Sequence, residues 1–294
     1  MLKVDAIGKR FGEVTALDGC SLTVERGRML GFLGPNGAGK TTTMRAIFGL
    51  VELDTGAVLW DGDPIGPDQR LRFGYMPEER GLYPKMKVGE HLVYLARLHG
   101  LTPAASRRNA QDLLERLGLG ERAGDTVQSL SLGNQQRAQI AAALVHDPEF
   151  LVLDEPFSGL DPIAVEVVQG VLKDRATSGA PVLFSSHQLD IVERLCDDLV
   201  IIADGEIRAN GTRERLRDEH SSPRFEIRTG GDAGWIRHVP GVTVLDVHGD
   251  YAVFEAATDA ASQAVVQQAS QRGSVLSFGQ QRPSLATIFK EIVK

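Results

Sequence analysis

The feature that most constrains the fold is a glycine-rich segment, GPNGAGKT, at residues 34–41. It fits the pattern GxxxxGK[ST] and lies directly between a short apolar run at residues 29–33 and a segment with helical apolar spacing. A strand, a glycine-rich turn and a helix N-terminus in that order present backbone N–H groups to phosphate oxygens. The sequence therefore predicts an α/β fold with a phosphate site at this turn.

Residues within the turn have distinct expected roles. Gly34, Gly37 and Gly39 permit positive φ angles and lack the Cβ that would keep the backbone away from a phosphate. We expect Lys40 at the β- and γ-phosphates of a nucleotide and the Thr41 hydroxyl on Mg²⁺. The expected nucleotide contacts are completed by Pro35, Asn36, Ala38 and Thr42.

Two acidic residues end a second apolar run, FLVLDEP, at residues 150–156. Asp154 would lie at the carboxyl end of a strand, where it suits Mg²⁺ coordination. Glu155, one residue further, would face the attacking water as a general base or water-orienting group. In isolation such a pair is equally well explained as a solvated strand end, but beside a phosphate site it predicts hydrolytic chemistry.

Composition excludes several classes of protein. The 294 residues suffice for two domains or for one large domain with an appendage. A formal net charge of −7 argues against nonspecific affinity for nucleic acid or an anionic membrane. No apolar run approaches the ~20 residues of a membrane span, and the start lacks the apolar core of a secretory signal, so we expect a cytoplasmic location. Cys20 and Cys196 form no CxxC pair, which gives no support to a disulfide framework or thiolate metal site.

Strand and helix patterns alternate along the first 220 residues. This alternation predicts a parallel sheet buried on both faces. The β-rich runs of that sheet lie at residues 29–33, 150–153, 182–184 and 199–202, separated by helical segments such as 41–48, 134–145 and 162–176. Runs at residues 2–7, 20–24 and 57–60 predict a smaller antiparallel layer, and a helical subdomain is expected at about 85–145. We expect one domain at residues 1–220.

The pattern changes after that point. The segments SSPRFEIR, VTVLDV and YAVFEA favour strands, followed by a helix at residues 259–270, a strand at SVLSF and a last helix that begins at Pro283-Ser284. This order resembles a ferredoxin-like α+β module. The sequence therefore predicts a small C-terminal accessory domain at residues 221–294.

A further segment, LSLGNQQR at residues 130–137, completes a set of motifs together with LVLDEPFSGLD and SSH. In this order and spacing they resemble the ATP-binding subunit of an ABC transporter over residues 2 to about 215. The resemblance implies a P-loop NTPase core, with ATP and Mg²⁺ as cofactors. Ser131 and Gly133 keep the small residues of the family signature, whereas Leu132 and Asn134 depart from its usual LSGGQ. In the family pattern this segment faces the γ-phosphate held by a partner subunit.

Three more site residues follow from the same resemblance. His187, in FSSHQ, matches a histidine that contacts the γ-phosphate. Phe11 stands where the family places an aromatic ring on adenine, although a core phenylalanine is the alternative. Asp161, in SGLD, matches the loop that crosses between two subunits.

The segment YMPEERGLYP departs from the family in one respect, because Glu78 replaces the usual glutamine of the lid loop. A carboxylate there can still reach Mg²⁺ and the nucleotide; alternatively it is only a solvated loop acid. This form of the loop resembles exporter ATPases for sodium and for drugs or antibiotics. Glu155, His187 and Lys40 are thus the expected catalytic residues, and Thr41, Asp154 and Glu78 the expected metal ligands.

Together these patterns predict an ATP-hydrolysing subunit of an ABC exporter. It would work as a dimer, bound to a separate transmembrane permease on the inner face of the cell membrane, and no nucleic-acid partner is expected. One alternative is a non-transport ABC-type ATPase that acts on nucleic acid, the ribosome or iron–sulfur assembly. The chain lacks the long coiled coil, second P-loop and basic arm that would favour it. Another alternative, a nucleotide-binding switch, predicts a missing base, but Glu155 is present.

Overall fold

The computed structural model describes residues 1–219, 223–281 and 283–293. Within them the chain forms two compact units, Met1–Arg213 with the chain end from Ile292, and Glu214–Glu291. The domain boundary expected between residues 220 and 221 lies outside the described residues, as do Ser221 and Ser222 at the start of the expected strand SSPRFEIR.

A six-stranded sheet forms the centre of the first unit, with the order β10-β9-β3-β8-β7-β6. All neighbouring pairs are parallel except β10 with β9. Every residue of β3, β7 and β8 is buried, as expected for parallel strands covered on both faces. The strand bounds are β3 Met29–Leu33, β6 Phe73–Met76, β7 Phe150–Leu153, β8 Val182–Ser185, β9 Asp198–Ala203 and β10 Glu206–Thr212.

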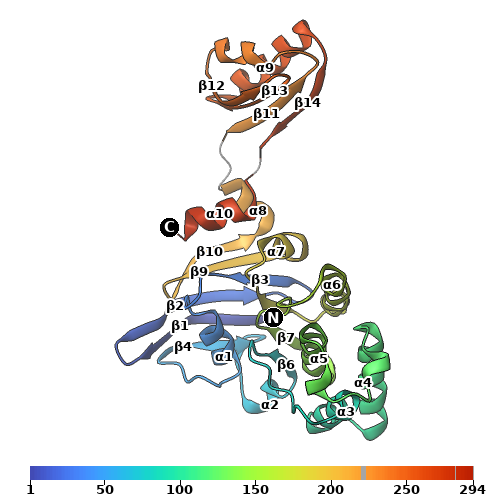
Figure 1. The fold of residues 1–294 in the computed structure, drawn as a ribbon. Coiled ribbons are helices and arrows are strands. Elements are labelled where there is room, and N and C mark those ends of the chain that lie inside the picture. Colours follow the sequence, from blue (N-terminus) through green and yellow to red (C-terminus); the bar gives the residue numbers. More distant parts are fainter. Residues whose placement is uncertain (220–222, 282, 294) are drawn as a thin grey trace. The chain divides into compact units, whose positions relative to one another are not determined.

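An antiparallel sheet with the order β2-β1-β4-β5 packs beside the central sheet (Figure 1). A single apolar core joins the two sheets, since it includes Leu22 and Val58 of the antiparallel layer and Phe32 and Val152 of the central sheet. The bounds are β1 Leu2–Phe11, β2 Val14–Val24, β4 Thr55–Trp60 and β5 Asp63–Pro64.

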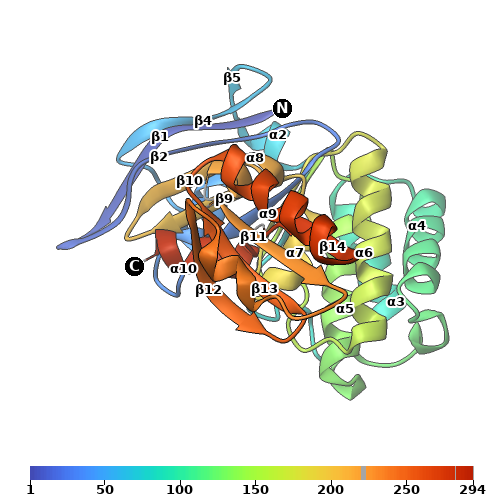
Figure 2. The same ribbon diagram turned by 90° about the horizontal axis from the view of Figure 1, so that it is seen from above.

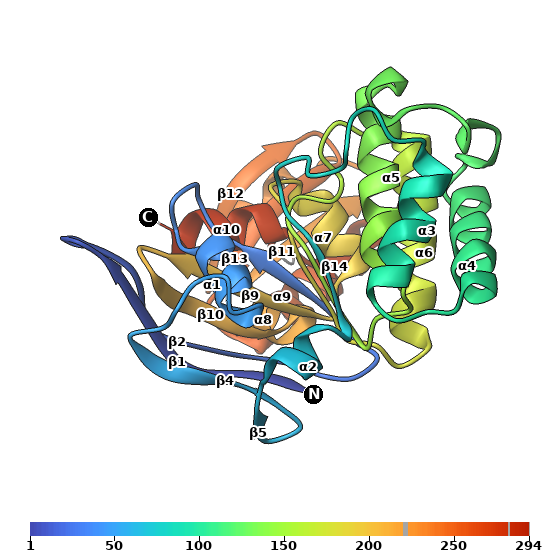
Figure 3. The same ribbon diagram turned by 90° about the horizontal axis from the view of Figure 1, so that it is seen from below.

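Helices of the first unit divide into two groups. One group, α3 to α5, lies across the central sheet from the antiparallel layer in all three views (Figures 1, 2 and 3). The bounds of this group are α3 Val88–Leu98, α4 Pro103–Arg116 and α5 Leu132–Leu144. Thr102 caps α4 by accepting a hydrogen bond from Ala105 N, and Pro103 takes the first helical position, as the sequence predicts. The other helices are α1 Lys40–Ile47, α2 Pro67–Arg70, α6 Pro162–Thr177 and α7 Leu189–Leu195.

The second unit contains a four-stranded antiparallel sheet with the order β12-β13-β11-β14. Numbered along this unit, the order is 2-3-1-4, the ferredoxin-like arrangement. Only a 3₁₀ turn at Gly234–His238 stands where that arrangement has its first helix. The bounds are β11 Arg224–Thr229, β12 Val242–His248, β13 Tyr251–Ala256, α9 Asp259–Arg272 and β14 Val275–Gln280, with α8 Arg213–Glu219 and α10 Leu285–Ile292 before and after them in the chain.

The predicted fold class is confirmed: a parallel sheet with flanking helices, an antiparallel layer, an inserted helical group and a small α+β unit. The sequence patterns did not predict the strands β5, β6 and β10. β6 is four residues long and includes Gly74, so it carries a weak strand signal. A Cβ at Gly74 would lie 2.2 Å from the Ala143 carbonyl oxygen, which shows that this glycine lets β6 approach the end of α5.

Candidate functional site

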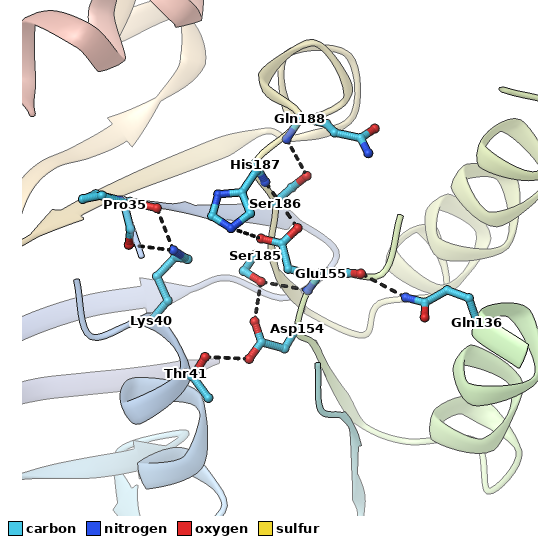
Figure 4. A network of polar contacts seen from close by, with 11 residues as sticks. Pro35, Lys40, Thr41, Gln136, Asp154, Glu155, Ser185, Ser186, His187 and Gln188 are labelled. Atoms are coloured by element: carbon cyan, nitrogen blue, oxygen red, sulfur yellow. Dashed lines mark hydrogen bonds and ion pairs between the residues drawn. The ribbon is translucent and has the colours of Figure 1, made fainter. Parts of the chain in front are cut away.

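The glycine-rich turn follows β3 directly and ends at the N-terminus of α1. Lys40, only 7% exposed, donates hydrogen bonds to the carbonyl oxygens of Gly34 at 2.6 Å and Pro35 at 3.0 Å (Figure 4). Burial lowers the pKa of its ammonium group, and the nearby Glu155, Asp154 and Glu78 oppose that shift. The cation is thus held inside the turn that an anionic ligand would enter.

Glycines of this turn serve two different physical needs. Gly37 and Gly39 have φ angles of 78° and 107°, which residues with a Cβ rarely adopt. Gly34 does not have a positive φ, so of the two properties expected of these glycines only the missing Cβ applies to it. It is required for space, because a Cβ there would lie 2.3 Å from the carbonyl oxygen of Ile202.

Asp154 lies at the end of β7, where it contacts the P-loop helix. Its Oδ2 accepts a hydrogen bond from the Thr41 hydroxyl at 2.8 Å, and its Oδ1 accepts one from Ser185 at 2.6 Å (Figure 4). The carboxylate is 2% exposed. A hydroxyl and a carboxylate side by side are the hard oxygen donors that Mg²⁺ prefers, together with phosphate and water oxygens.

Glu155, the next residue, has a φ of 52°, which costs on the order of 1–3 kcal/mol for a residue with a side chain. Its N–H donates to Ser185 Oγ at 2.9 Å, and its carbonyl oxygen accepts from Gln136 Nε2 at 3.0 Å. Burial raises the pKa of its carboxyl group, while the nearby His187 lowers it. His187 Nε2 lies 3.2 Å from Oε1, and the His187 N–H donates to Oε2 at 3.3 Å (Figure 4).

These groups line one cavity of about 320 Å³. It unites the turn, the acidic pair, the lid loop and His187. Its lining residues are Asn36, Gly37, Ala38, Gly39, Lys40, Thr41, Thr42, Glu78, Asp154, Glu155 and His187. The remaining predicted site residues do not line it: Phe11, Gly34, Pro35, Ser131, Gly133 and Asp161.

Relatives identify the family to which this arrangement belongs. A family model described as ABC transporter matches residues 17–158, and a model for the C-terminal domain of DrrA1-3-like ATP-binding proteins matches residues 211–293. The uncharacterized ABC transporter ATP-binding protein YhaQ of Bacillus subtilis (strain 168) is 38% identical over 293 residues, which cover 100% of this chain and 98% of that protein. The chain belongs to the ATP-binding proteins of the ABC transporter family.

Two further comparisons agree with this assignment. The linearmycin resistance ATP-binding protein LnrL of the same Bacillus subtilis strain is 38% identical over 219 residues, 74% of this chain and 70% of its own length. A solved structure of an ATP-binding subunit of an ABC transporter is 34% identical, with a TM-score of 0.70 over 74% of this chain and 92% of its own. This ABC protein is therefore an ATPase, as the sequence motifs predict.

In this ABC ATPase four of the residues outside the cavity are exposed, namely Phe11, Pro35, Ser131 and Asp161, whereas Gly133 is half-buried and Gly34 is buried. Ser131 caps α5 by accepting a hydrogen bond from Asn134 N at 3.4 Å, and Asp161 caps α6 by accepting one from Ala164 N at 2.8 Å. Gly133 lies against the loop before α6, since a Cβ there would be 3.3 Å from the Gly159 carbonyl oxygen. Phe11 is 52% exposed, so the alternative of a core phenylalanine is wrong.

Sequence reasoning missed three polar residues that hold the ABC site together. Ser185, fully buried, bridges the Asp154 carboxylate and the Glu155 N–H. Gln136 and Gln139 of α5 donate to backbone carbonyls on both sides of the cavity. The three-residue spacing of the glutamines, which places both on one helix face, was the available signal.

Proposed function

We propose that this chain is the ATP-hydrolysing subunit of an exporter, acting on the cytoplasmic side of the membrane together with a separate permease. The observation that carries the proposal is the cavity in which Lys40, Thr41, Asp154 and Glu155 meet. A role in export is supported by the linearmycin resistance protein LnrL among the relatives. Within the described residues, no helix combines the length and the apolar character needed to cross a bilayer.

Hydrolysis would use the groups of this cavity in defined roles. Lys40 would bind the β- and γ-phosphates, and Thr41 with Asp154 would hold Mg²⁺, which supplies positive charge to the phosphate oxygens. The described residues contain no cluster of three or more His, Cys, Asp or Glu side chains placed for a metal ion. One carboxylate and one hydroxyl are nevertheless the kind of small protein ligand set that Mg²⁺ uses beside nucleotide phosphates.

Glu155 would orient the attacking water and accept its proton. Burial raises its pKa and so makes the carboxylate a better base, while His187 keeps the raised pKa from going further. His187 is exposed on its outer side, with 52% of the side chain accessible, so it can also meet a γ-phosphate. Glu78 lines the same cavity and would approach the metal from the lid loop.

A second copy of the chain would complete each site. Ser131 and Gly133 lie outside the cavity of their own chain, and Ser131 is exposed at the N-terminus of α5. A helix N-terminus with an exposed hydroxyl favours an anionic partner. We propose that this segment faces the γ-phosphate held by the partner, and that Asp161 lies in the adjoining crossing loop.

The permease would dock in a groove of about 570 Å³ beside the lid loop. Leu82 and Pro77 of that loop, Leu95 of α3 and Ala142 of α5 contribute apolar surface to it. The groove thus joins the lid loop and the inserted helices, the two elements through which we propose that the permease is held. Two further proposals follow from the sequence. Phe11 would contact the adenine ring. The ATP-binding domain would comprise residues 1–220, and the accessory domain residues 221–294.

The test is co-purification from detergent with the membrane protein encoded beside this gene. We expect a stable complex whose Mg²⁺-dependent ATPase activity changes with permease present, and a weaker complex for Ala142→Arg, which places a charge in the groove. Ala104→Arg, at an exposed position of α4, is the matched control. Full ATPase activity in the purified chain with no membrane partner in any preparation would contradict the transport role.

A further inference from the structure

Two glutamines of α5 hold the backbone on opposite sides of the catalytic cavity. Gln136 and Gln139 are three residues apart, and both are 4% exposed. Each donates its amide nitrogen to two carbonyl oxygens of a loop that carries a cavity carboxylate. Since carbonyl oxygens only accept hydrogen bonds, the amide nitrogens rather than the amide oxygens must face them.

Gln136 acts on the loop that follows β7. Its Nε2 lies 3.0 Å from the carbonyl oxygen of Glu155 and 3.2 Å from that of Pro156. Ser185 binds the N–H of the same glutamate, so both backbone polar groups of Glu155 are held by side chains. A residue at a φ of 52° needs such restraint, because the surrounding contacts must over-determine a sparsely populated conformation.

Gln139 acts on the lid loop. Its Nε2 lies 2.7 Å from the carbonyl oxygen of Pro77 and 3.0 Å from that of Glu79, the two residues that flank Glu78. Glu78 itself lines the catalytic cavity, whereas Pro77 and Gln139 line the 570 Å³ groove. Gln139 therefore lines the groove and at the same time binds the backbone on both sides of a cavity residue.

We propose that Gln136 and Gln139 are positioning residues that fix Glu155 and Glu78 relative to α5, so that the helix and both carboxylates move as one body. The inference rests on the proposed roles of these two carboxylates. Ser131 caps the N-terminus of the same helix. Displacement of this helix by an occupant of the groove would consequently shift the signature segment and both acidic groups together.

Isosteric substitutions separate positioning from simple packing. Methionine fills the volume of glutamine but donates no hydrogen bond, so Gln136→Met and Gln139→Met remove the amide hydrogen bonds to the two loops with little change in packing. A misplacement of about 1 Å at a catalytic group costs up to about 10²-fold in rate. We expect kcat to fall about 10- to 100-fold in Gln136→Met and less in Gln139→Met, with the KM for ATP nearly unchanged.

Double variants distinguish a positioning role from a purely structural one. In the full-length chain, Gln136→Met should cause no further loss when Glu155 is already glutamine, and Gln139→Met none when Glu78 is already alanine. Single-turnover measurements resolve the slow rates of these backgrounds. Nucleotide affinity and the thermal midpoint are followed in parallel to show that each variant is folded.

The matched control is Asn109→Leu. Asn109 also donates a side-chain amide to a backbone carbonyl, that of Val145 at 3.1 Å, but it holds no loop of the cavity. The kcat of Asn109→Leu should stay within about twofold of the wild-type value, since a substitution outside the cavity seldom changes the geometry of a remote site.

Three results would overturn the positioning role. The first is a wild-type kcat in both methionine variants. The second is an equal loss of kcat whether or not Glu155 or Glu78 is present. The third is a loss of kcat that parallels a loss of nucleotide affinity and a lower thermal midpoint. Full turnover by Glu155→Gln would instead contradict the proposed function of the cavity. An impaired Glu155→Gln beside a fully active Gln136→Met would contradict only the inference drawn here for Gln136.

Discussion

The two halves of the phosphate-handling chemistry differ in how complete they are within one chain. On the cavity side, Lys40 and Asp154 are buried and bonded, and Ser185 ties Asp154 to Glu155. On the signature side, Ser131 and Leu132 are exposed, and the Ser131 hydroxyl accepts a hydrogen bond from the neighbouring Asn134 N–H. One half is preformed by the fold, whereas the other is exposed, in keeping with the proposal that a partner subunit binds there.

The preformed half should fail most severely when its base is removed. Glu155→Gln keeps the shape of the side chain but cannot accept the proton, so we expect turnover to fall by about 10² to 10⁴-fold. Nucleotide affinity should remain, because Lys40 and the turn are intact. Phosphate release and nucleotide binding are measured on the same preparation. Turnover near the wild-type rate would remove Glu155 from the catalytic role.

The incomplete half is tested by mixing two inactive variants. Lys40→Ala removes the cation at the phosphates, and Gly133→Asp places a carboxylate where the partner's γ-phosphate is proposed to lie. Like charges in a water-excluded site repel by several kcal/mol, so each variant alone should be nearly inactive. A mixed dimer has one site with both lesions and one site with neither.

Equal amounts of the two variants should therefore restore ATPase activity to about a quarter of the wild-type rate, if half of the dimers are mixed and one site of each works. Phosphate release is followed over a range of mixing ratios, after subunit exchange has been verified with differently tagged chains. A fully active Gly133→Asp would show that the signature segment does not face phosphate. Recovery that does not peak near equal amounts would contradict a shared site.

The same contrast explains what the sequence could predict. Lys40, Thr41, Asp154 and Glu155 follow from short motifs at strand ends, because parallel strands bring their carboxyl ends to one edge of a sheet. Ser185, Gln136 and Gln139 act through partners that are distant in sequence. The three-residue spacing of the two glutamines places them on one helix face, but it does not identify the carbonyl groups that they bind. The steric requirement at Gly34 likewise depends on Ile202, 168 positions later, and only the folded chain shows it.

Substitutions of Glu78 in the lid loop test whether its carboxylate has a role in the cavity. Glu78→Gln restores an uncharged oxygen of equal reach, so we expect ATPase activity within a few-fold of wild type. Glu78→Ala removes the oxygen ligand and should lower activity about tenfold, within the range seen for lost polar contacts in active sites. Steady-state rates over a range of Mg²⁺ concentrations provide the comparison. Equal activity of all three chains would identify Glu78 as a solvated loop acid.

The smallest expected effect concerns the pH dependence of the preformed half. Burial raises the pKa of Glu155 above its ordinary value, and the nearby His187 opposes that shift. A general base works when deprotonated, so activity is lost as the pH falls through the pKa of Glu155. His187→Ala removes the imidazole that lowers this pKa, while the backbone N–H bond to Oε2 remains. The pKa must then rise.

We therefore expect the acid limb of the kcat profile to move to higher pH in His187→Ala. The rate at high pH separately reports any loss of a direct phosphate contact, because Glu155 is deprotonated there in both chains. His248→Ala is the matched control: His248 also pairs with a carboxylate, Asp246 at 3.0 Å, but it lies in the second unit. An acid limb that stays in place, or moves to lower pH, would show that His187 does not set the protonation of the proposed base.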